Sequence, residues 1–259
     1  MDRRREPLPT RVRDTPELPA AYDAALRAGL EDLGLELSEP ARAAIDGHVR
    51  LLLAWTPSIN LTAISDPAAV ALGHVVDSLT ALTWLRDQGI ARLLDLGSGG
   101  GFPGLPLAAA QPTLAATLVE PVTKKARFLE TVAEASDLAG RVEVIAARAE
   151  DLARHPDHRG RWPVVTARGV AAGADLVELA FPLLVPGGSL VAWKRGDLTA
   201  ELAAAHRAIE ALGGGFIEVR DVRIGGLRDH ILVVATRASA GRVPDRYPRE
   251  PAARRRQPW

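Results

Sequence analysis

The apolar residues of the first ninety positions recur with the period of α-helices. Three helices are expected there, over residues 20–37, 38–56 and 66–85. Ser38 is typical of a residue that caps the second helix, and Pro57 is expected to end it. Asp66 and Pro67 are typical of the start of the third. Residues 20–90 are therefore predicted to form an all-helical N-terminal cap.

The period changes at Arg92, after which short apolar strands alternate with helices. The strand Leu93–Leu96 runs into a glycine-rich turn, Gly97–Gly101, and a helix is expected from Pro103. Further strands are expected over 116–120, 142–146, 164–167 and 189–193, with helices over 122–136, 150–154, 175–184 and 198–212. This alternation predicts a parallel sheet with helices on both faces.

The chain closes with two consecutive strand patterns instead of another strand and helix. Residues 216–223 and 230–236 flank a Gly-Gly pair, which predicts an antiparallel hairpin. A plain dinucleotide-binding fold has six parallel strands and no such hairpin. We therefore predict an α/β fold with a doubly wound, seven-stranded, mostly parallel sheet. Its parts are a disordered, basic and proline-rich tail over 1–19, the helical cap over 20–90, the core over 91–237, and an Arg/Pro-rich tail over 238–259.

The net charge of zero hides an uneven distribution. The chain has 259 residues with 32 basic and 32 acidic side chains. Residues 1–13 carry five arginines against two acids, and residues 237–259 carry seven arginines against two acids. The ends therefore have net charges of +3 and +5, and the body between them has −8. Such basic ends suit a nucleic-acid partner, and they also occur as segments that only keep a chain in solution.

Several classes of protein are excluded by composition. The sequence has no cysteine, which excludes disulfides, thiolate metal sites and cysteine nucleophiles, and its residue pattern predicts no metal site. No apolar run approaches the ~20 residues of a membrane span. Residues 1–22 also lack the apolar stretch of a secretory signal. We expect a cytoplasmic protein without a membrane partner.

The glycine-rich turn is a candidate ligand site. The pattern Gly99-x-Gly101-x-x-Gly104 satisfies the dinucleotide fingerprint, which is a weak signal by itself. Asp95, two residues before Gly97, is a poor neighbour for a pyrophosphate and suits a cation. S-adenosylmethionine carries a sulfonium and an ammonium group and no phosphate, so Asp95 favours it over a dinucleotide. Asp95 could equally hold the turn through hydrogen bonds.

Glu120 is the second acid near this turn. It ends the second strand, 23 residues after Gly97, near the offset at which an acid meets ribose hydroxyls in doubly wound folds. Both candidate ligands contain a ribose, so Glu120 does not discriminate between them. Its alternative role is to cap the following helix.

The residues around the turn resemble one family. The stretch Leu93–Pro106, above all its Phe102-Pro103-Gly104-x-Pro106 continuation, resembles the glycine loop of the ribosomal RNA small subunit methyltransferase G (GidB) family. The resemblance covers about residues 24–250. Its other matching stretches are Trp55 with Ile59–Ile64, His74-x-x-Asp77-Ser78, Val119-Glu120, Lys124–Leu129, Ala147–Glu150, Val164–Arg168, Pro186–Gly188 with Lys194, and Arg246–Arg249.

This resemblance implies the class I S-adenosylmethionine-dependent methyltransferase fold. It also implies methyl transfer from S-adenosyl-L-methionine to N7 of a guanine in small-subunit (16S) ribosomal RNA. Cofactor contacts are implied at Gly97, Phe102, Ala149 and Glu150 near the adenine, and Arg168. Together with the residues already discussed, the expected cofactor-binding set is Asp95, Gly97, Gly99, Gly101, Phe102, Glu120, Ala149, Glu150 and Arg168.

Methyl transfer to guanine N7 requires no acid–base catalysis by side chains. Guanine N7 has a free lone pair and no proton to lose, so its methylation requires alignment and electrostatics but no general base. Arg168 and Lys194 follow the fourth and fifth strands, and we expect them to hold the guanine and flanking phosphates. His74 and Asp77 can share a helix face. Asn60, the fifth candidate for positioning the substrate, could be only a turn residue.

The expected partner is small-subunit ribosomal RNA or the 30S subunit, bound by a monomer. Three alternatives stay open. The chain could be a class I methyltransferase acting on another RNA or on a protein. It could be an NAD-dependent oxidoreductase, which the glycine fingerprint alone would allow. It could also be a non-catalytic RNA-binding relative, as suggested by the arginine-rich ends and by Gly73, where the family usually has a basic residue.

Overall fold

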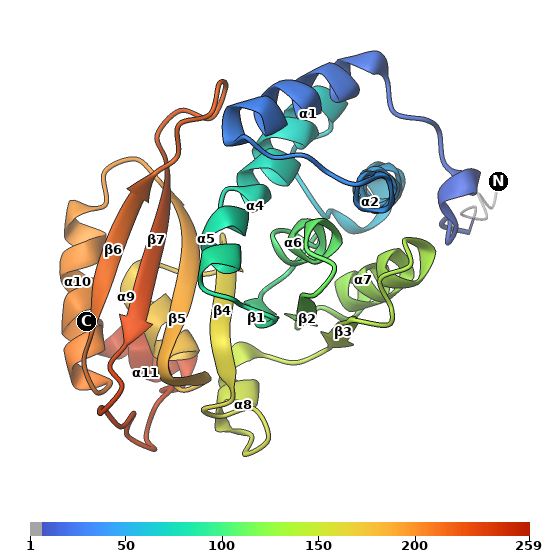
Figure 1. Cartoon of the computed structure of the whole chain (residues 1–259). Helices are drawn as coiled ribbons and strands as arrows, with labels where there is room; N and C mark the ends of the chain where they lie inside the picture. The colour runs from blue at the N-terminus through green and yellow to red at the C-terminus, as the bar shows by residue number, and fades with distance from the viewer. Residues whose placement is uncertain (1–6) are drawn as a thin grey trace.

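A computed structural model describes residues 7–259 and has at its centre a twisted sheet of seven strands (Figure 1). The strands are β1 (Arg92–Leu96), β2 (Ala115–Val119), β3 (Val142–Ile145), β4 (Trp162–Arg168), β5 (Leu184–Arg195), β6 (Gly215–Asp221) and β7 (His230–Arg237). Their order is β3-β2-β1-β4-β5-β7-β6. The first five are parallel, and β7 is antiparallel to both β5 and β6. This confirms the predicted fold class.

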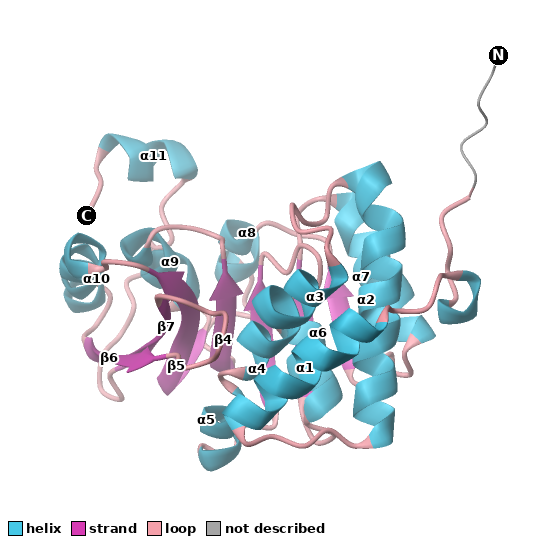
Figure 2. Ribbon diagram, turned by 90° about the horizontal axis from the view of Figure 1, so that it is seen from above, coloured by secondary structure: helices cyan, strands magenta, loops and turns pink. Residues whose placement is uncertain are grey.

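Helices cover both faces of the sheet, as Figures 1 and 2 show. One face packs against the cap helices α1 (Ala20–Leu33) and α2 (Glu39–Ile59) and against α6 (Gly104–Ala110) and α7 (Thr123–Ala135). The other face packs against α8 (Ala149–Arg154), α9 (Gly173–Ala180) and α10 (Thr199–Ala211). Neighbouring strand residues such as Leu93 and Leu94 therefore belong to different hydrophobic clusters, although both are fully buried. The chain order reverses between β1 and β4, where doubly wound sheets bind ligands.

Helix α2 begins as expected and ends later than expected. The hydroxyl of Ser38 accepts the backbone N–H of Ala41 at 3.4 Å. Pro57 lies inside the helix, which continues to Ile59 and ends where Asn60 takes a left-handed conformation with φ of 51°. The prediction of an end at Pro57 was wrong because a proline in the last turn removes only one terminal hydrogen bond.

The third predicted helix is broken into several turns. It consists of α3 (Pro67–Val70), a π-helical segment η2 (Ala71–Val76), α4 (Asp77–Leu79) and α5 (Leu82–Asp87). A π-helical segment is rare and often occurs at functional sites, and this one carries His74 and leads directly to Asp77.

The segment Pro67–Asp87 also corrects the statement that no apolar run is long enough for a membrane span. An 18-residue stretch within these 21 residues has a mean hydropathy of 1.4, so by length and composition alone the segment could cross a membrane. About 61% of this stretch is buried inside the protein. Packing against the sheet and against α1 accounts for its apolar composition.

The chain ends are packed against the body. The indole N–H of Trp55 donates to the Pro9 carbonyl at 2.7 Å, and Leu8 and Val12 pack on the cap. The expectation of a disordered tail is therefore wrong over residues 7–19, because apolar side chains among the charged ones have a surface to cover. Residues 1–6 lie outside the described residues. At the other end, Val243 and Tyr247 belong to the buried cluster of α9, and the chain closes with α11 (Pro251–Arg256).

Candidate active site at the carboxyl edge of the sheet

The glycine turn follows β1 at the carboxyl edge of the sheet. Gly97, Gly99 and Gly101 all have positive φ, of 64°, 54° and 92°. A Cβ added to Gly101 would lie 2.4 Å from a methyl carbon of Leu105 and 2.9 Å from Nε2 of His48. The turn is thus packed tightly on its inner side. A Cβ added to Gly99 would meet only the Gly97 carbonyl, at 3.8 Å, so the outer side is open to a ligand.

Asp95 lies beneath this turn and is fully buried. Its carboxylate accepts the hydroxyl of Thr166 at 2.7 Å and the backbone N–H of Gly104 at 3.3 Å. Burial raises the pKa of Asp95 from 3.8 to about 6, against the opposing effect of these hydrogen bonds. All of its described contacts are internal, so Asp95 ties the turn to β4, as in the alternative role considered for it.

Glu120 connects the same turn to α7. One carboxylate oxygen accepts the backbone N–H of Gly99 at 2.9 Å, and the other accepts that of Val122 at 2.9 Å. Only 5% of Glu120 is exposed. Each oxygen has a second lone pair, so Glu120 can still accept ligand hydroxyl groups while it holds the turn.

The ring of Phe102 forms the centre of a stack beside the turn. The centroids of His48 and His74 lie 4.5 and 4.8 Å from that of Phe102, and the guanidinium of Arg168 lies 5.2 Å from it. Burial, with a further contribution from Arg168, lowers the pKa of His48 to about 4 and that of His74 to about 3. Both imidazoles are therefore neutral at pH 7. His48 donates its Nε2–H to the Gly100 carbonyl at 2.7 Å and so supports the turn from α2.

Arg168, at the end of β4, is bound to the π-helical segment. Its guanidinium donates to Asp77 Oδ2 at 3.1 Å, to the Gly73 carbonyl at 3.0 Å and to His74 Nδ1 at 3.0 Å. His74 Nδ1 must then be the acceptor, so its Nε2–H faces the hydroxyl of Thr62 at 2.7 Å. The structure thus brings together three of the residues predicted to position the substrate: Arg168, His74 and Asp77.

Asp77 has two further partners that the sequence did not reveal. Its Oδ1 accepts Nδ1–H of His230 at 2.8 Å, and its backbone carbonyl accepts the indole N–H of Trp193 at 2.6 Å. Asp77 and His230 are only 2% and 6% exposed. His230 begins β7 opposite Arg195 of β5, so only the antiparallel register places it beside the cap.

A cavity of about 390 Å³ opens at these residues. Its lining is formed by Gly73, His74, Asp77, Arg168, Gly169, Trp193, Lys194, Arg195 and His230. Arg195 is exposed there, on the same face of β5 as Trp193. It is a second cation near Arg168 that the sequence reasoning did not single out.

Two predicted residues have other surroundings. The ammonium of Lys194 is bound to Glu201 of α10 at 2.5 Å and to the Ala171 carbonyl at 2.8 Å, on the face of β5 opposite to Arg195. Asn60 is an exposed residue at the end of α2, and its backbone N–H closes the helix on the Thr56 carbonyl. Lys194 therefore lines the cavity around Arg168 while its ammonium is held by α10, and Asn60 does not line that cavity.

Ala149 and Glu150 begin α8, after the short loop that follows β3, at the same edge of the sheet as the turn. Glu150 is 8% exposed, and its carboxylate accepts a hydrogen bond from Arg254 of α11 at 2.5 Å. Burial alone would raise the pKa of Glu150, but the guanidinium of Arg254 outweighs it and lowers the pKa. Arg254 lies 104 residues further along the chain, so no local pattern could have predicted this pairing.

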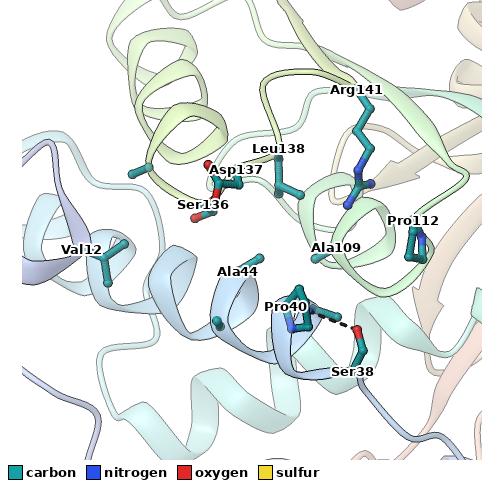
Figure 3. Close-up of a pocket in the computed structure, with 13 residues that line it drawn as sticks. Val12, Ser38, Pro40, Ala44, Ala109, Pro112, Ser136, Asp137, Leu138 and Arg141 are labelled. Carbon is teal, nitrogen blue, oxygen red and sulfur yellow. Dashed lines mark hydrogen bonds between the residues drawn. The ribbon is translucent and has the colours of Figure 1, made fainter.

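A separate cavity of about 540 Å³ lies at the opposite edge of the sheet (Figure 3). It is bounded by the start of α2 at Ser38, by Pro112 before β2, and by Arg141 before β3. None of the predicted site residues lines it. Among residues 7–259 there is also no group of three or more histidine, aspartate or glutamate side chains that could hold a metal ion.

Comparison with known proteins gives a matching family and a matching fold. The family model described as rRNA small subunit methyltransferase G matches residues 42–225. The ribosomal RNA small subunit methyltransferase G of Chloroflexus aggregans is 43% identical over 217 residues, which is 83% of this chain and 89% of that protein. The same-named protein of Deinococcus deserti is 41% identical over 234 residues, or 90% and 94% of the two chains.

Solved structures with lower identity share the fold. An O-methyltransferase from Bacillus cereus, in complex with SAH, superposes with a TM-score of 0.55 at 16% identity and covers 74% of this chain and 91% of that chain. A SAM-dependent O-methyltransferase from Thermotoga maritima gives a TM-score of 0.51 at 17% identity, with 72% and 71% covered.

Proposed function

The chain belongs to the rRNA small subunit methyltransferase G family, and from this premise we propose that it methylates N7 of a guanine in small-subunit ribosomal RNA with S-adenosylmethionine as the methyl donor. The observation that carries the proposal is the junction of the glycine turn with the cavity around Arg168, through the ring of Phe102. A cofactor site and a substrate site that adjoin in this way are what direct methyl transfer needs.

The residues at the turn fit S-adenosylmethionine. The open outer side of Gly99 admits a ligand to the backbone, and Glu120 retains lone pairs for ribose hydroxyls. The start of α8 at Ala149 and Glu150 would border the adenine, and Gly97, Gly101 and Phe102 would border the rest of the molecule. Asp95 contributes a buried negative charge below the turn, which suits a cationic ligand when its carboxyl is ionised. When bound, this cofactor supplies a methyl group on a positively charged sulfur.

The proposed reaction moves no proton. The lone pair of guanine N7 forms a bond to the methyl carbon, the carbon–sulfur bond breaks, and its electron pair stays on sulfur. The positive charge passes to the guanine ring. Because N7 carries no proton, no general base is needed. The neutral state of His48 and His74 suits this step, because no histidine cation adds to the repulsion of the new charge.

Alignment would fall to the side chains of the cavity. Arg168 uses two of its guanidinium nitrogens on Asp77, Gly73 and His74, and its remaining N–H groups can donate to the guanine or to a phosphate. Arg195 is exposed at the mouth of the cavity and is the second cation that can reach RNA. Lys194 would instead fix the end of β5 through Glu201. We infer that a monomer in the cytoplasm acts on the RNA of the small subunit.

Methyl transfer to defined RNA tests this function. Purified protein is incubated with labelled S-adenosylmethionine and either deproteinised small-subunit ribosomal RNA or assembled small subunits, and nuclease digests are analysed by mass spectrometry. We expect N7-methylguanosine at one position in at least one of these substrates. Label on another atom, or in a protein, would replace the proposed acceptor, and no label in either substrate would refute the proposal.

A further inference from the structure

The last residues of the chain, Val243–Trp259, are ordered against the body of the protein, and the proposed function assigns them no role. We call this segment the C-terminal strap. It packs against α8 and α9, and Figure 2 shows α11 beyond these helices, on the side to which β4 points. Its composition is unusual, since five of its residues are arginines: Arg246, Arg249, Arg254, Arg255 and Arg256. Their contacts divide them into two groups.

The first group anchors the strap to buried acids. Glu178 of α9 is fully buried, and its carboxylate accepts the backbone N–H and the guanidinium of Arg249 at 2.6 and 2.7 Å. The same carboxylate accepts the indole N–H of Trp259 at 2.8 Å, and the Arg249 guanidinium lies over that indole ring at 4.6 Å. Arg254 forms the second anchor, on Glu150 of α8.

The body of the protein also binds the backbone of the strap. Arg159, in the loop before β4, donates to the carbonyls of Tyr247 and Pro244 at 2.8 and 3.1 Å. Arg154 of α8 donates to the Pro248 carbonyl at 2.8 Å. Charge-assisted hydrogen bonds to buried groups are the strong ones, so the strap is held in one position.

The second group of arginines points outward. Arg255 and Arg256 in the last turn of α11 are exposed and form no ion pair or hydrogen bond with the described part of the chain. Arg246 is exposed and lies over the ring of Tyr247 at 5.1 Å. Two of the five arginines of the strap are thus paired with buried acids, and Arg255 and Arg256 are exposed directly after the anchored Arg254.

Arg255 and Arg256 lie in the part of the strap that is anchored beside the carboxyl edge of the sheet, where the proposed reaction occurs, whereas Arg246 lies in the part bound by Arg159, in the loop that precedes β4. Glu150, which binds Arg254 of α11, lies in the first turn of α8, close to the carboxyl edge of the sheet where the glycine turn also lies. Other exposed cations follow the same edge: Lys124 in the first turn of α7, Arg148 before α8, and Arg195 at the end of β5. The planar fork of arginine binds phosphate oxygens in a bidentate way, which makes a nucleic acid the natural partner of such a row.

We propose that the exposed last turn of α11, with Arg255 and Arg256, is a docking site for backbone phosphates of the RNA substrate. The proposal rests on the proposed function, because it takes the partner to be the methylated RNA. The anchors to Glu150 and Glu178 give the site its rigidity. The RNA therefore meets a preformed cationic surface and does not have to order a mobile arm.

A double variant, Arg255→Ala/Arg256→Ala, tests this site. Affinity for deproteinised small-subunit ribosomal RNA is measured across a range of salt concentrations. We expect about tenfold weaker binding near physiological salt, and a logarithmic salt dependence shallower by about 1 to 2, because two phosphate contacts are lost. S-adenosylmethionine affinity, measured by calorimetry, and the melting temperature should stay unchanged.

The matched control is Arg92→Ala/Arg161→Ala, which removes two exposed arginines at the opposite edge of the sheet and should bind RNA as the unaltered protein does. Unchanged RNA affinity and salt dependence in the strap variant would overturn the proposal. The same holds if only binding to assembled subunits falls, since the strap would then contact a ribosomal protein. Failure of the unaltered protein to methylate either substrate would instead refute the proposed function.

Discussion

Arg168 is the residue on which the substrate site depends most. Its side chain is mostly buried, and its charge is balanced by the carboxylate of Asp77 at 3.1 Å. Removing one partner of a buried pair leaves the other charge uncompensated, which costs about 3–5 kcal/mol. A loss of activity in Arg168→Ala would therefore be accompanied by a loss of stability, and that variant alone cannot separate the two roles.

Arg168→Lys separates them. A lysine keeps the positive charge beside Asp77 but cannot reproduce the planar fork that also reaches Gly73 and His74. We expect methylation to fall by about 10²-fold while unfolding in denaturant changes little. If Arg168→Lys retains full activity, the geometry of the guanidinium is unimportant and Arg168 serves only as the counter-charge of Asp77.

His230 offers a second test at the residue scale. In His230→Asn, the side-chain amide can donate to Asp77 Oδ1 in place of the imidazole Nδ1–H, whereas His230→Leu has no donor. The leucine variant should lose about 1–3 kcal/mol of stability, because Asp77 is buried and loses one of its hydrogen bonds. The asparagine variant should recover most of it. Equal losses in the two variants would show that the size of the ring matters and the hydrogen bond does not.

At the scale of elements, the strands and the glycine turn could be predicted, because each follows from a local pattern. Short apolar runs separated by helical periods specify β1 to β5, and the Gly-Gly pair specifies the hairpin. The π-helical segment could not be predicted in this way. Six mostly apolar residues, Ala71–Val76, fit an α-helix as well as a π-helix. The hydrogen-bond partners of His74 and Asp77, Arg168 and His230, lie far away in the sequence, so a local pattern cannot include them.

The roles of Lys194 and Arg195 show a related limit. Both residues are cations at the end of one strand, and the alternation of a strand sends them to opposite faces. The sequence and the family resemblance pointed to Lys194, but the pairing of β5 with β7 puts Arg195 and Trp193 on the face with His230. Both residues line the cavity, but the ammonium of Lys194 is bound to Glu201 of α10, whereas Arg195 is exposed on the face with Trp193 and His230.

Helix α2 supports the glycine turn through His48, which leads to a prediction about pH. The pKa of His48 falls from 6.5 to about 4 on folding, so the unfolded chain takes up a proton first as the pH decreases. The contribution of His48 to stability is therefore present above pH 6.5 and is lost as the pH falls toward 4, by up to about 1.4 kcal/mol per pH unit.

His48→Gln provides the comparison, since a glutamine N–H can still donate to the Gly100 carbonyl. The unfolding free energy of both proteins is measured at pH 7 and pH 5. Asp95, whose raised pKa acts in the opposite direction over this range, is present in both and cancels. We expect a smaller loss in the variant, and an equal loss would show that His48 is protonated in the folded protein.

At the scale of the whole molecule, the distribution of charge acquires a structural meaning. In the sequence, residues 237–259 have a net charge of +5 and the body of the chain, residues 14–236, has a net charge of −8. Some of these opposite charges form ion pairs in the structure: Arg249 binds the buried Glu178, and Arg254 binds the buried Glu150. Counting charges could predict basic ends, but partners 71 and 104 residues apart are set only by the completed fold.

The proposed activity of the whole molecule is methylation of a guanine N7 in small-subunit ribosomal RNA. The most direct measurement maps N7-methylguanosine in that RNA from cells with the gene, from cells without it, and from cells that carry only the Arg168→Lys variant. We expect one modified guanine that disappears without the gene, returns with the unaltered protein and is strongly reduced with the variant. A ribosomal RNA with the same N7-methylguanosine content in the presence and absence of the gene would contradict it.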